Sequence, residues 1–398
     1  MVRRLFLTIL FCLPLVLQSC AQNNPENEPF SIQVIESFLL RYPEKVPLDA
    51  RRWLENRWGY EQGVMLEAIR RVGEATGDQK YFDYIKQHFD HYIMDDGDID
   101  TYVFDSFNID NIPPGRQLFW LYRETGEERY RLAADLLRQQ LREHPRTNQG
   151  GYWHKQIYPY QMWLDGIYMG QPFYAQYAVE FDEPEIFDDV ANQIIWIEEN
   201  TRDDETGLLY HAWDESREMD WADQETGQSP HFWGRAIGWY AMGIVDVLDY
   251  FPEDHPEYGT ILDIFQRMSA ALLEYQDAET GIWYQVVDQG ERPGNYLESS
   301  VTAMLSYSFA KGVRMGYLDD RFLDSARRAF DGLLQHKVVV DRHGVVNLHD
   351  GCSVGGLGGS PYRDGSFQYY INEPRRTNDF KAFGPLVFAA LEMEKIEN

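Results

Sequence analysis

The sequence predicts an all-α fold, an (α/α)6 barrel with short β-strands in its loops. Two observations predict it. Polar amphipathic segments alternate six times with apolar segments rich in small residues, and no polar capping repeat of the kind that ends an open solenoid is present. Nothing resembles an interdomain linker, so residues 31–398 are expected to form a single domain.

The expected outer helices carry apolar residues at helical spacing with charged residues between them. Phe187, Val190, Ile194 and Ile197 show this spacing in one of them. The outer helices are predicted at 31–41, 79–93, 127–143, 184–200, 256–275 and 320–336.

The expected inner helices are more apolar and begin near small residues such as Gly59, Gly166 and Gly234. Small residues would let the helix starts crowd around an axis. The loops that lead into these helices should therefore gather at one end of the ring, where functional residues are to be sought. The inner helices are predicted at 59–76, 113–125, 164–180, 231–250, 297–315 and 380–396.

Three similar stretches each predict a turn followed by a short strand. They run over 204–211, 278–285 and 341–349, with Gly207, Gly281 and Gly344 at the turns. Glycine tolerates the left-handed backbone conformation that such turns require.

The first residues are typical of an export signal. Arg3 and Arg4 precede a short apolar run, and Leu17-Gln18-Ser19-Cys20 resembles a bacterial lipobox. We therefore expect a lipoprotein signal peptide at 1–20, a lipid on Cys20 and a polar tether at 21–30. This predicts a periplasmic or outer-membrane protein of a Gram-negative bacterium, held to the membrane only through its lipid. Cleavage without lipidation is the alternative, because Gln18 is not the commonest residue at its place in a lipobox.

The bulk charge excludes some partners. The formal net charge of -29 argues against nucleic-acid binding. No cysteine or histidine cluster shows zinc-ligand spacing, so no metal is expected. The glycine-rich stretch at 352–359 lacks the lysine and the spacing of a phosphate-binding loop.

Asp165 lies within a dense aromatic and glycine cluster that includes Trp163 and Tyr168. Apolar surroundings raise the pKa of a carboxyl group, which suits a general acid at neutral pH. The aromatic side chains also offer faces on which a sugar ring can stack. A helix cap or a hydrogen-bonded core aspartate is the alternative interpretation.

Asp110 precedes the rigid Pro113-Pro114 entry to the next inner helix upstream of Asp165. It can be an N-cap. Because Asp110 and Asp165 open consecutive inner helices, their side chains could also converge, and paired carboxylates are the usual equipment for acid–base chemistry on sugars.

Arg235 and Trp239 are four residues apart and share a helix face, just after Trp233. A guanidinium beside an indole can bind a carboxylate while the ring packs on a sugar. A structural cation–π pair is an equal alternative. Further donors near the expected mouth are His154, Lys155 and His211.

Together these motifs resemble the unsaturated rhamnogalacturonyl hydrolases of glycoside hydrolase family 105. The resemblance runs from about Trp58 to the C-terminus and rests on four blocks, with departures at 372–374 and 382–384. These blocks are 154–173, 210–216, 229–235 and 352–381.

The resemblance implies hydration of a 4,5-unsaturated uronate at the end of a lyase-generated oligosaccharide, without a cofactor. Asp165 would be the general acid and base, and Asp110 would hold ring hydroxyls and keep Asp165 protonated. The resemblance makes His211, Arg235, Trp233 and Trp239 substrate-binding residues, to which we add His154, Lys155, Trp163 and Tyr168.

Other functions remain open on the sequence alone. One is an unsaturated glucuronyl hydrolase acting on glycosaminoglycan, ulvan or arabinogalactan fragments. Others are an ordinary inverting glycosidase, whose two carboxylates would lie about 6.5–9.5 Å apart, a sugar epimerase and a non-catalytic glycan-binding lipoprotein.

Overall fold

A computed structural model describes residues 28–49 and 57–397. The predicted signal peptide, Cys20 and most of the predicted tether lie outside the described residues.

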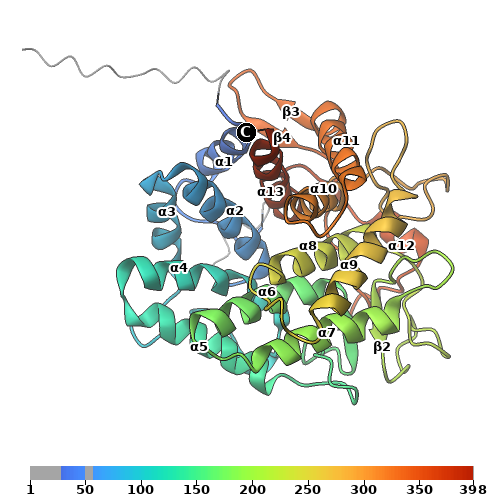
Figure 1. The fold of residues 1–398 in the computed structure, drawn as a ribbon, viewed down its shortest axis with the longest axis horizontal. Coiled ribbons are helices and arrows are strands. Elements are labelled where there is room, and N and C mark those ends of the chain that lie inside the picture. The colour runs from blue at the N-terminus through green and yellow to red at the C-terminus, as the bar shows by residue number, and fades with distance from the viewer. Residues whose placement is uncertain (1–27, 50–56, 398) are drawn as a thin grey trace, which may run out of the picture.

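The described chain forms an inner ring of helices (Figure 1). Each inner helix contacts the next, and α13 packs against α2, which closes the ring. The inner helices are α2 (Tyr60–Thr76), α4 (Arg116–Thr125), α6 (Asp165–Glu180), α8 (Gly234–Val247), α10 (Ser299–Arg314) and α13 (Phe380–Glu397).

A second ring surrounds the first, so the predicted (α/α)6 barrel is confirmed. Its helices run antiparallel to the inner ones because each pair is joined as a hairpin. The outer helices are α1 (Phe30–Arg41), α3 (Gln79–Phe89), α5 (Glu128–Glu143), α7 (Ile186–Thr201), α9 (Tyr258–Leu273) and α11 (Asp320–His336).

The helix boundaries differ from the predicted ones mainly where proline or loop contacts intervene. α4 begins at Arg116 because the prolines form a separate 3-10 turn, η4 (Pro113–Gly115). Two further 3-10 turns precede it, η2 (Phe104–Ser106) and η3 (Ile109–Asn111), and a short helix, α12 (Phe367–Asn372), lies in the tail before α13.

Small residues do allow the inner helices to approach closely. A Cβ atom on Gly63 would lie 2.7 Å from the backbone nitrogen of Pro114, and one on Gly384 would lie 2.4 Å from Val64. Real Cβ atoms do not come so close, so these positions accept only glycine without moving a neighbouring helix.

The predicted turns are confirmed, whereas their strands are only partly present. Gly207, Gly281 and Gly344 have φ angles of 71°, 74° and 79°. Only the third turn leads into a strand of a ladder, β4 (Val346–Leu348), which pairs with β3 (Val338–Val340). The other two are followed by isolated bridges at Leu209 and Tyr284.

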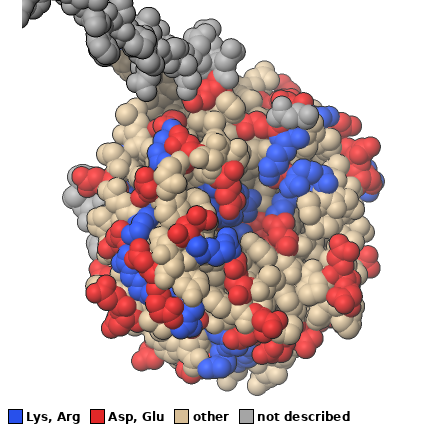
Figure 2. All heavy atoms as spheres, turned by 60° about the vertical axis from the view of Figure 1, so that its left-hand side comes forward, with Lys and Arg blue, Asp and Glu red and all other residues tan. Residues whose placement is uncertain are grey.

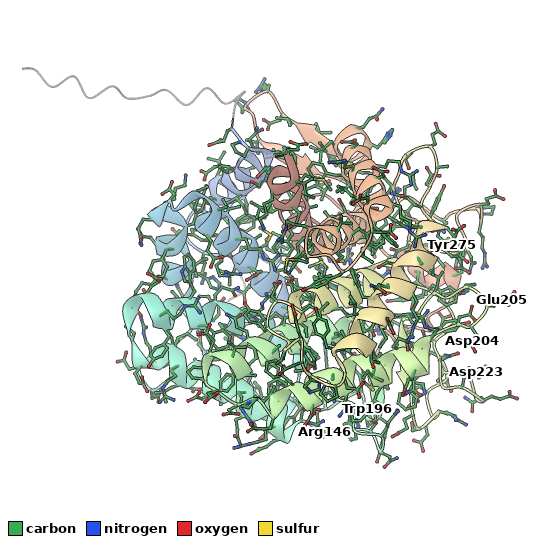
Figure 3. All side chains as sticks on the ribbon, in the orientation of Figure 1. Arg146, Trp196, Asp204, Glu205, Asp223 and Tyr275 are labelled. Carbon is green, nitrogen blue, oxygen red and sulfur yellow. The ribbon has the colours of Figure 1, made fainter. Side chains whose placement is uncertain are left out.

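The first two turns belong to a motif that occurs three times, with an aspartate three residues before a threonine. In each copy the aspartate side chain accepts hydrogen bonds from the backbone and the hydroxyl group of the threonine. Asp204, Glu205 and Asp223 mark two of these turns in Figure 3, and Tyr275 precedes the third. The three aspartates are Asp203, Asp223 and Asp277.

The remaining strands form two short antiparallel pairs in loops. β1 (Gln161–Trp163) pairs with β2 (Ala212–Asp214), and β5 (Gly351–Cys352) pairs with β6 (Arg375–Arg376). Strand β1 was not predicted, because its three residues are buried together and show no alternation.

On the face that Figure 2 shows, acidic and basic side chains are interspersed. Among the described residues, no helix combines the length and the apolar character needed to cross a bilayer.

Candidate active site

All six inner helices begin at the same end of the ring, which we call the mouth. The first turns of these helices bring polar side chains together there, while their aligned N-termini present a partial positive charge. This charge favours an anionic ligand even though the whole chain is strongly acidic. The polar residues at the helix starts are Tyr60, Glu61, Asp110, Asp165, Arg235, Glu298, Ser300, Asp379 and Lys381.

The β1–β2 pair places Asp165 beside His211. Trp163 lies opposite Ala212 in the ladder, and the backbone N–H of Leu164 donates to the carbonyl oxygen of His211 at 3.0 Å. Because Asp165 is the first residue of α6, this pairing fixes its side chain at the mouth.

The Asp165 carboxyl group lacks a close partner. Its Oδ2 atom lies 3.9 Å from Nε2 of His154, and its Oδ1 atom lies 3.8 Å from Nε2 of His211. The Oδ1 atom is buried without a hydrogen bond, although 14% of the side chain remains exposed. Burial raises the pKa of Asp165, and the nearby Asp110 charge adds to this while His154 opposes it.

Asp110 has the opposite environment. Lys155 Nζ lies 2.6 Å from its Oδ2 atom, and His154 Nε2 lies 3.3 Å from its Oδ1 atom. Burial alone would raise the pKa of Asp110, but Lys155 and His154 outweigh it and hold the pKa well below its usual range. Asp110 is therefore ionised, whereas the raised pKa of Asp165 favours its protonated form.

The two aspartates converge as predicted. Asp110, His154 and Asp165 each place one polar atom within 4.8 Å of the others. These three atoms could in principle hold a cation. The Lys155 ammonium already neutralises Asp110, however, so a divalent ion would meet a like charge at once. The absence of a metal stays a prediction.

His211 is completely buried and is held from behind by a residue that the sequence analysis did not single out. Its Nδ1 atom lies 2.8 Å from the hydroxyl oxygen of Tyr370, while its Nε2 atom has no hydrogen-bond partner and faces Asp165. Burial lowers the pKa of His211 well below its usual value, so the ring is neutral. A neutral imidazole nitrogen can accept a hydrogen bond from a carboxyl group in one tautomer and donate a hydrogen bond to a carboxylate in the other.

The predicted sugar-stacking faces are covered by protein. Trp163 stacks on His154 with ring centroids 4.5 Å apart and also on Tyr158 at 4.9 Å, which leaves it 5% exposed. Tyr168 packs on Trp239 at 4.6 Å. The prediction of open faces was wrong, because the loop before β1 supplies the rings that cover Trp163 and the inner helix α8 supplies the ring that packs on Tyr168.

Arg235 and Trp233 also differ from expectation. The Arg235 guanidinium lies 5.9 Å from the Trp233 ring, so the predicted pairing with Trp239 was wrong. It donates to Ser300 Oγ at 2.7 Å and to the carbonyl oxygens of Cys352 and Ser353. With 1% exposure, Arg235 ties the tail segment to α8 and α10. Trp233 is buried between His211 and Tyr370.

Two residues of α2 were missed by sequence reasoning. Burial raises the pKa of the Tyr60 hydroxyl, and the charges of Glu61 and Asp110 add to the effect. Burial also raises the pKa of Glu61, which Lys381 opposes from 3.9 Å. Their position at an inner-helix start was the available signal.

Comparisons with known proteins agree with this geometry. Residues 31–397 match the model of Glycosyl Hydrolase Family 88. A solved structure of a family 105 glycoside hydrolase from C. acetobutylicum ATCC 824 is 44% identical, with 92% of this chain and all of that chain covered and a TM-score of 0.88. The chain belongs to the glycoside hydrolases of families 88 and 105.

Two curated relatives add detail. "Protein Atu3128" of Agrobacterium fabrum is 36% identical over 230 residues, which cover 56% of this chain and 97% of that protein. The unsaturated rhamnogalacturonyl hydrolase YesR of Bacillus subtilis is 27% identical over 252 residues, which cover 62% of this chain and 68% of that protein.

Proposed function

We propose that this glycoside hydrolase is an unsaturated rhamnogalacturonyl hydrolase that removes a 4,5-unsaturated uronate from lyase-generated oligosaccharides by acid-catalysed hydration. The observation that carries the proposal is the contrast between two neighbouring carboxyl groups. Burial raises the pKa of Asp165, while Lys155 and His154 keep Asp110 ionised beside it.

The chemistry follows from the double bond of the substrate, which is a vinyl ether. Asp165 donates its proton to C4, and the positive charge that develops at C5 is shared with the ring oxygen. Water attacks C5 and gives its proton to the Asp165 carboxylate, which restores the acid. The resulting hemiketal opens and expels the neighbouring sugar.

The other residues hold the reactants. Asp110 accepts hydrogen bonds from ring hydroxyl groups, and its negative charge favours the protonated form of Asp165. The inner-helix N-termini and the Lys155 ammonium favour the carboxylate of the uronate. The Nε2 atom of His211 has no hydrogen-bond partner and lies 3.8 Å from Asp165, where it can form a hydrogen bond with the Asp165 carboxyl group.

Three other glycoside hydrolase activities could use the same carboxyl groups. An unsaturated glucuronyl hydrolase would use the same chemistry on another leaving sugar. An ordinary retaining glycosidase would use Asp110 as a nucleophile, since the two carboxyl groups are close enough. Both oxygens of Asp110 lie against cationic or donor groups, which disfavours attack on carbon. The short separation also disfavours an inverting glycosidase.

The deciding experiment follows ultraviolet absorbance of the C4=C5 chromophore with unsaturated disaccharides from rhamnogalacturonan and from glycosaminoglycans. We expect absorbance to fall fastest with the rhamnogalacturonan disaccharide, and saturated counterparts to stay intact. Cleavage of a saturated counterpart would favour an ordinary glycosidase. Faster loss with a glycosaminoglycan disaccharide would favour the glucuronyl activity.

We also propose that the enzyme acts in the periplasm or at the outer membrane, attached through Cys20, which lies outside the described residues. The support is the lipobox-like Leu17-Gln18-Ser19-Cys20. Cells fed radiolabelled palmitate should label the wild type and not the Cys20→Ser variant. Equal labelling of both would overturn this assignment.

A further inference from the structure

A small cavity lies against the His154 ring, and neither catalytic aspartate lines it. It leaves about 10 Å³ for the centre of a water molecule, which is room for a water and far too little for a sugar. The nine residues that line it are all buried. They come from η3, the loop before β1, β1 itself, α6 and α7.

Two polar side chains of this lining have buried atoms without a partner. Nδ1 of His154 and both amide atoms of Gln171, Nε2 and Oε1, form no hydrogen bond with any described residue. Gln171 is completely buried and His154 is 3% exposed. An unpaired buried polar atom is costly, and the cavities that stay dry in proteins are apolar. The three atoms therefore indicate a polar occupant.

The start of α6 and the strand before it direct these atoms toward the cavity. Gln171 follows Ile167 by four residues, so the two side chains share the helix face that lines the cavity. Gly166 also lines it, and a Cβ atom on Gly166 would lie 3.4 Å from Nδ1 of His154. Trp163 stacks on the His154 ring with 9° between the ring planes, which fixes the orientation of the ring. Nδ1 thus faces the cavity, while Nε2 faces the aspartates.

We propose that a water molecule is bound in this cavity between Nδ1 of His154 and the Gln171 amide, and that Gln171 acts through it as a positioning residue for the catalytic site. The water can accept a hydrogen bond from Nε2 of the amide or donate one to its Oε1, and in both cases it can still donate to Nδ1. A neutral imidazole carries a single proton. An Nδ1 atom that accepts a hydrogen bond therefore leaves this proton on Nε2.

The proton on Nε2 matters because this atom lies near both carboxyl groups. Nε2 donates to Oδ1 of Asp110 at 3.3 Å and lies 3.9 Å from Oδ2 of Asp165. Without its proton, Nε2 would lose the hydrogen bond to Asp110 and could take the proton that Asp165 must deliver. The inference rests on the proposed function, since the His154 tautomer affects turnover only where Asp165 acts as an acid.

A crystal structure at a resolution that shows ordered water tests the binding site without any assay. In the wild type we expect one water within about 2.7–3.2 Å of both Nδ1 of His154 and the Gln171 amide. In the Gln171→Met variant, whose side chain has a similar length and no amide, we expect none. A dry cavity in the wild type overturns the proposal.

The kinetics of Gln171→Met test the positioning role. On the unsaturated disaccharide, kcat should fall by about 2- to 10-fold, the size of one net hydrogen bond. KM should stay near the wild-type value, because the Gln171 side chain is completely buried. The Tm should not fall, because the change breaks no hydrogen bond to a described residue. An unchanged kcat overturns the positioning role.

Gln193→Met is the matched control, because Gln193 lines the same cavity with an amide that is already bonded. Its Oε1 accepts from the backbone N–H of Tyr152 at 2.8 Å, and its Nε2 donates to Gly150 and Asp189 at 3.1 Å. This variant should lower the Tm and leave kcat of the folded enzyme unchanged. If it lowers kcat as much as Gln171→Met does, the effect is one of packing and the proposal is overturned.

A double-mutant cycle shows whether Gln171 acts through His154. The His154→Gln variant keeps a donor toward Asp110 and lacks Nδ1, so Gln171→Met should cause no further fall in kcat in that background. A further fall of the same size overturns the route through His154. A wild type that leaves the unsaturated chromophore intact overturns the proposed function instead, while the crystal structure alone decides whether the water is bound.

Discussion

Two buried aspartates near the axis of the barrel have opposite environments. Asp165 lies at the mouth with an oxygen that accepts no hydrogen bond, and the nearest ring nitrogens are 3.8 and 3.9 Å away. Asp246 lies at the C-terminal end of α8 and is completely buried. It accepts bonds from Arg71 at 2.7 Å, Arg116 at 2.8 Å and Lys311 at 2.9 Å.

The surroundings decide the protonation state of each side chain. Burial would raise the pKa of both, and it does so for Asp165. For Asp246 the three cations and the Tyr307 hydroxyl group outweigh burial and hold the pKa well below its usual value. A carboxylate whose oxygens are all paired with cations and hydrogen-bond donors stabilises the ring of helices. A carboxyl group without such partners is available for proton transfer.

The largest effect is expected at the mouth. Asp165→Asn removes the acid but keeps the shape of the side chain, so activity on the unsaturated disaccharide should fall by at least about 10²–10⁴-fold. Stability should not change, because Asp165 has no ion pair closer than 3.8 Å to lose. Chromophore assays and thermal unfolding measure both, and near-wild-type activity would refute the assignment.

The converse is expected at the barrel axis. Asp246→Asn leaves Arg71, Arg116 and Lys311 without their shared anion and should lower the free energy of unfolding by about 3–5 kcal/mol. Activity per folded molecule should persist. The control is Asp249→Asn, since Asp249 is exposed and contacts the Lys311 end of the network at 2.6 Å, with an expected cost of about 1 kcal/mol or less. Equal losses in denaturant titrations would contradict the contrast.

A smaller effect is expected behind His211. Tyr370→Phe removes the hydroxyl group that holds Nδ1, which should lower kcat by about 5- to 150-fold, the equivalent of about 1–3 kcal/mol. KM should change little, since Tyr370 is buried behind the ring. Tyr369→Phe is the matched control, because its hydroxyl group accepts from Gly356 instead. If both variants lower kcat alike, Tyr370 has no special role.

The finest test is the pH dependence of kcat/KM. Asp165 must be protonated to act, so activity should fall as the pH rises through its pKa. Asp110→Asn removes a charge that raises this pKa and should move the alkaline limb to lower pH. Lys155→Met removes a charge that lowers it and should move the limb to higher pH. Shifts of the same sign in both variants would contradict the proposed coupling.

Much of the architecture was predictable because helical periodicity and small residues are local signals. The inner helices predicted at 59–76 and 164–180 occur at 60–76 and 165–180. The convergence of Asp110 and Asp165 also followed, since consecutive inner helices must begin at the same end. Strand β1 could not be predicted, because its three residues are all buried and show no alternation of apolar and polar side chains.

The sequence by itself determined the ring of helices, the end at which the chemistry gathers and the two aspartates that meet there. Only the tertiary structure decided what each polar side chain does. The Arg235 guanidinium donates hydrogen bonds to the carbonyl oxygens of Cys352 and Ser353 in the tail segment. The His211 ring is hydrogen-bonded to Tyr370, which is 159 residues away in the sequence. The reason is physical: periodicity depends on near neighbours, whereas hydrogen bonding, burial and pKa depend on groups that meet only when the ring closes.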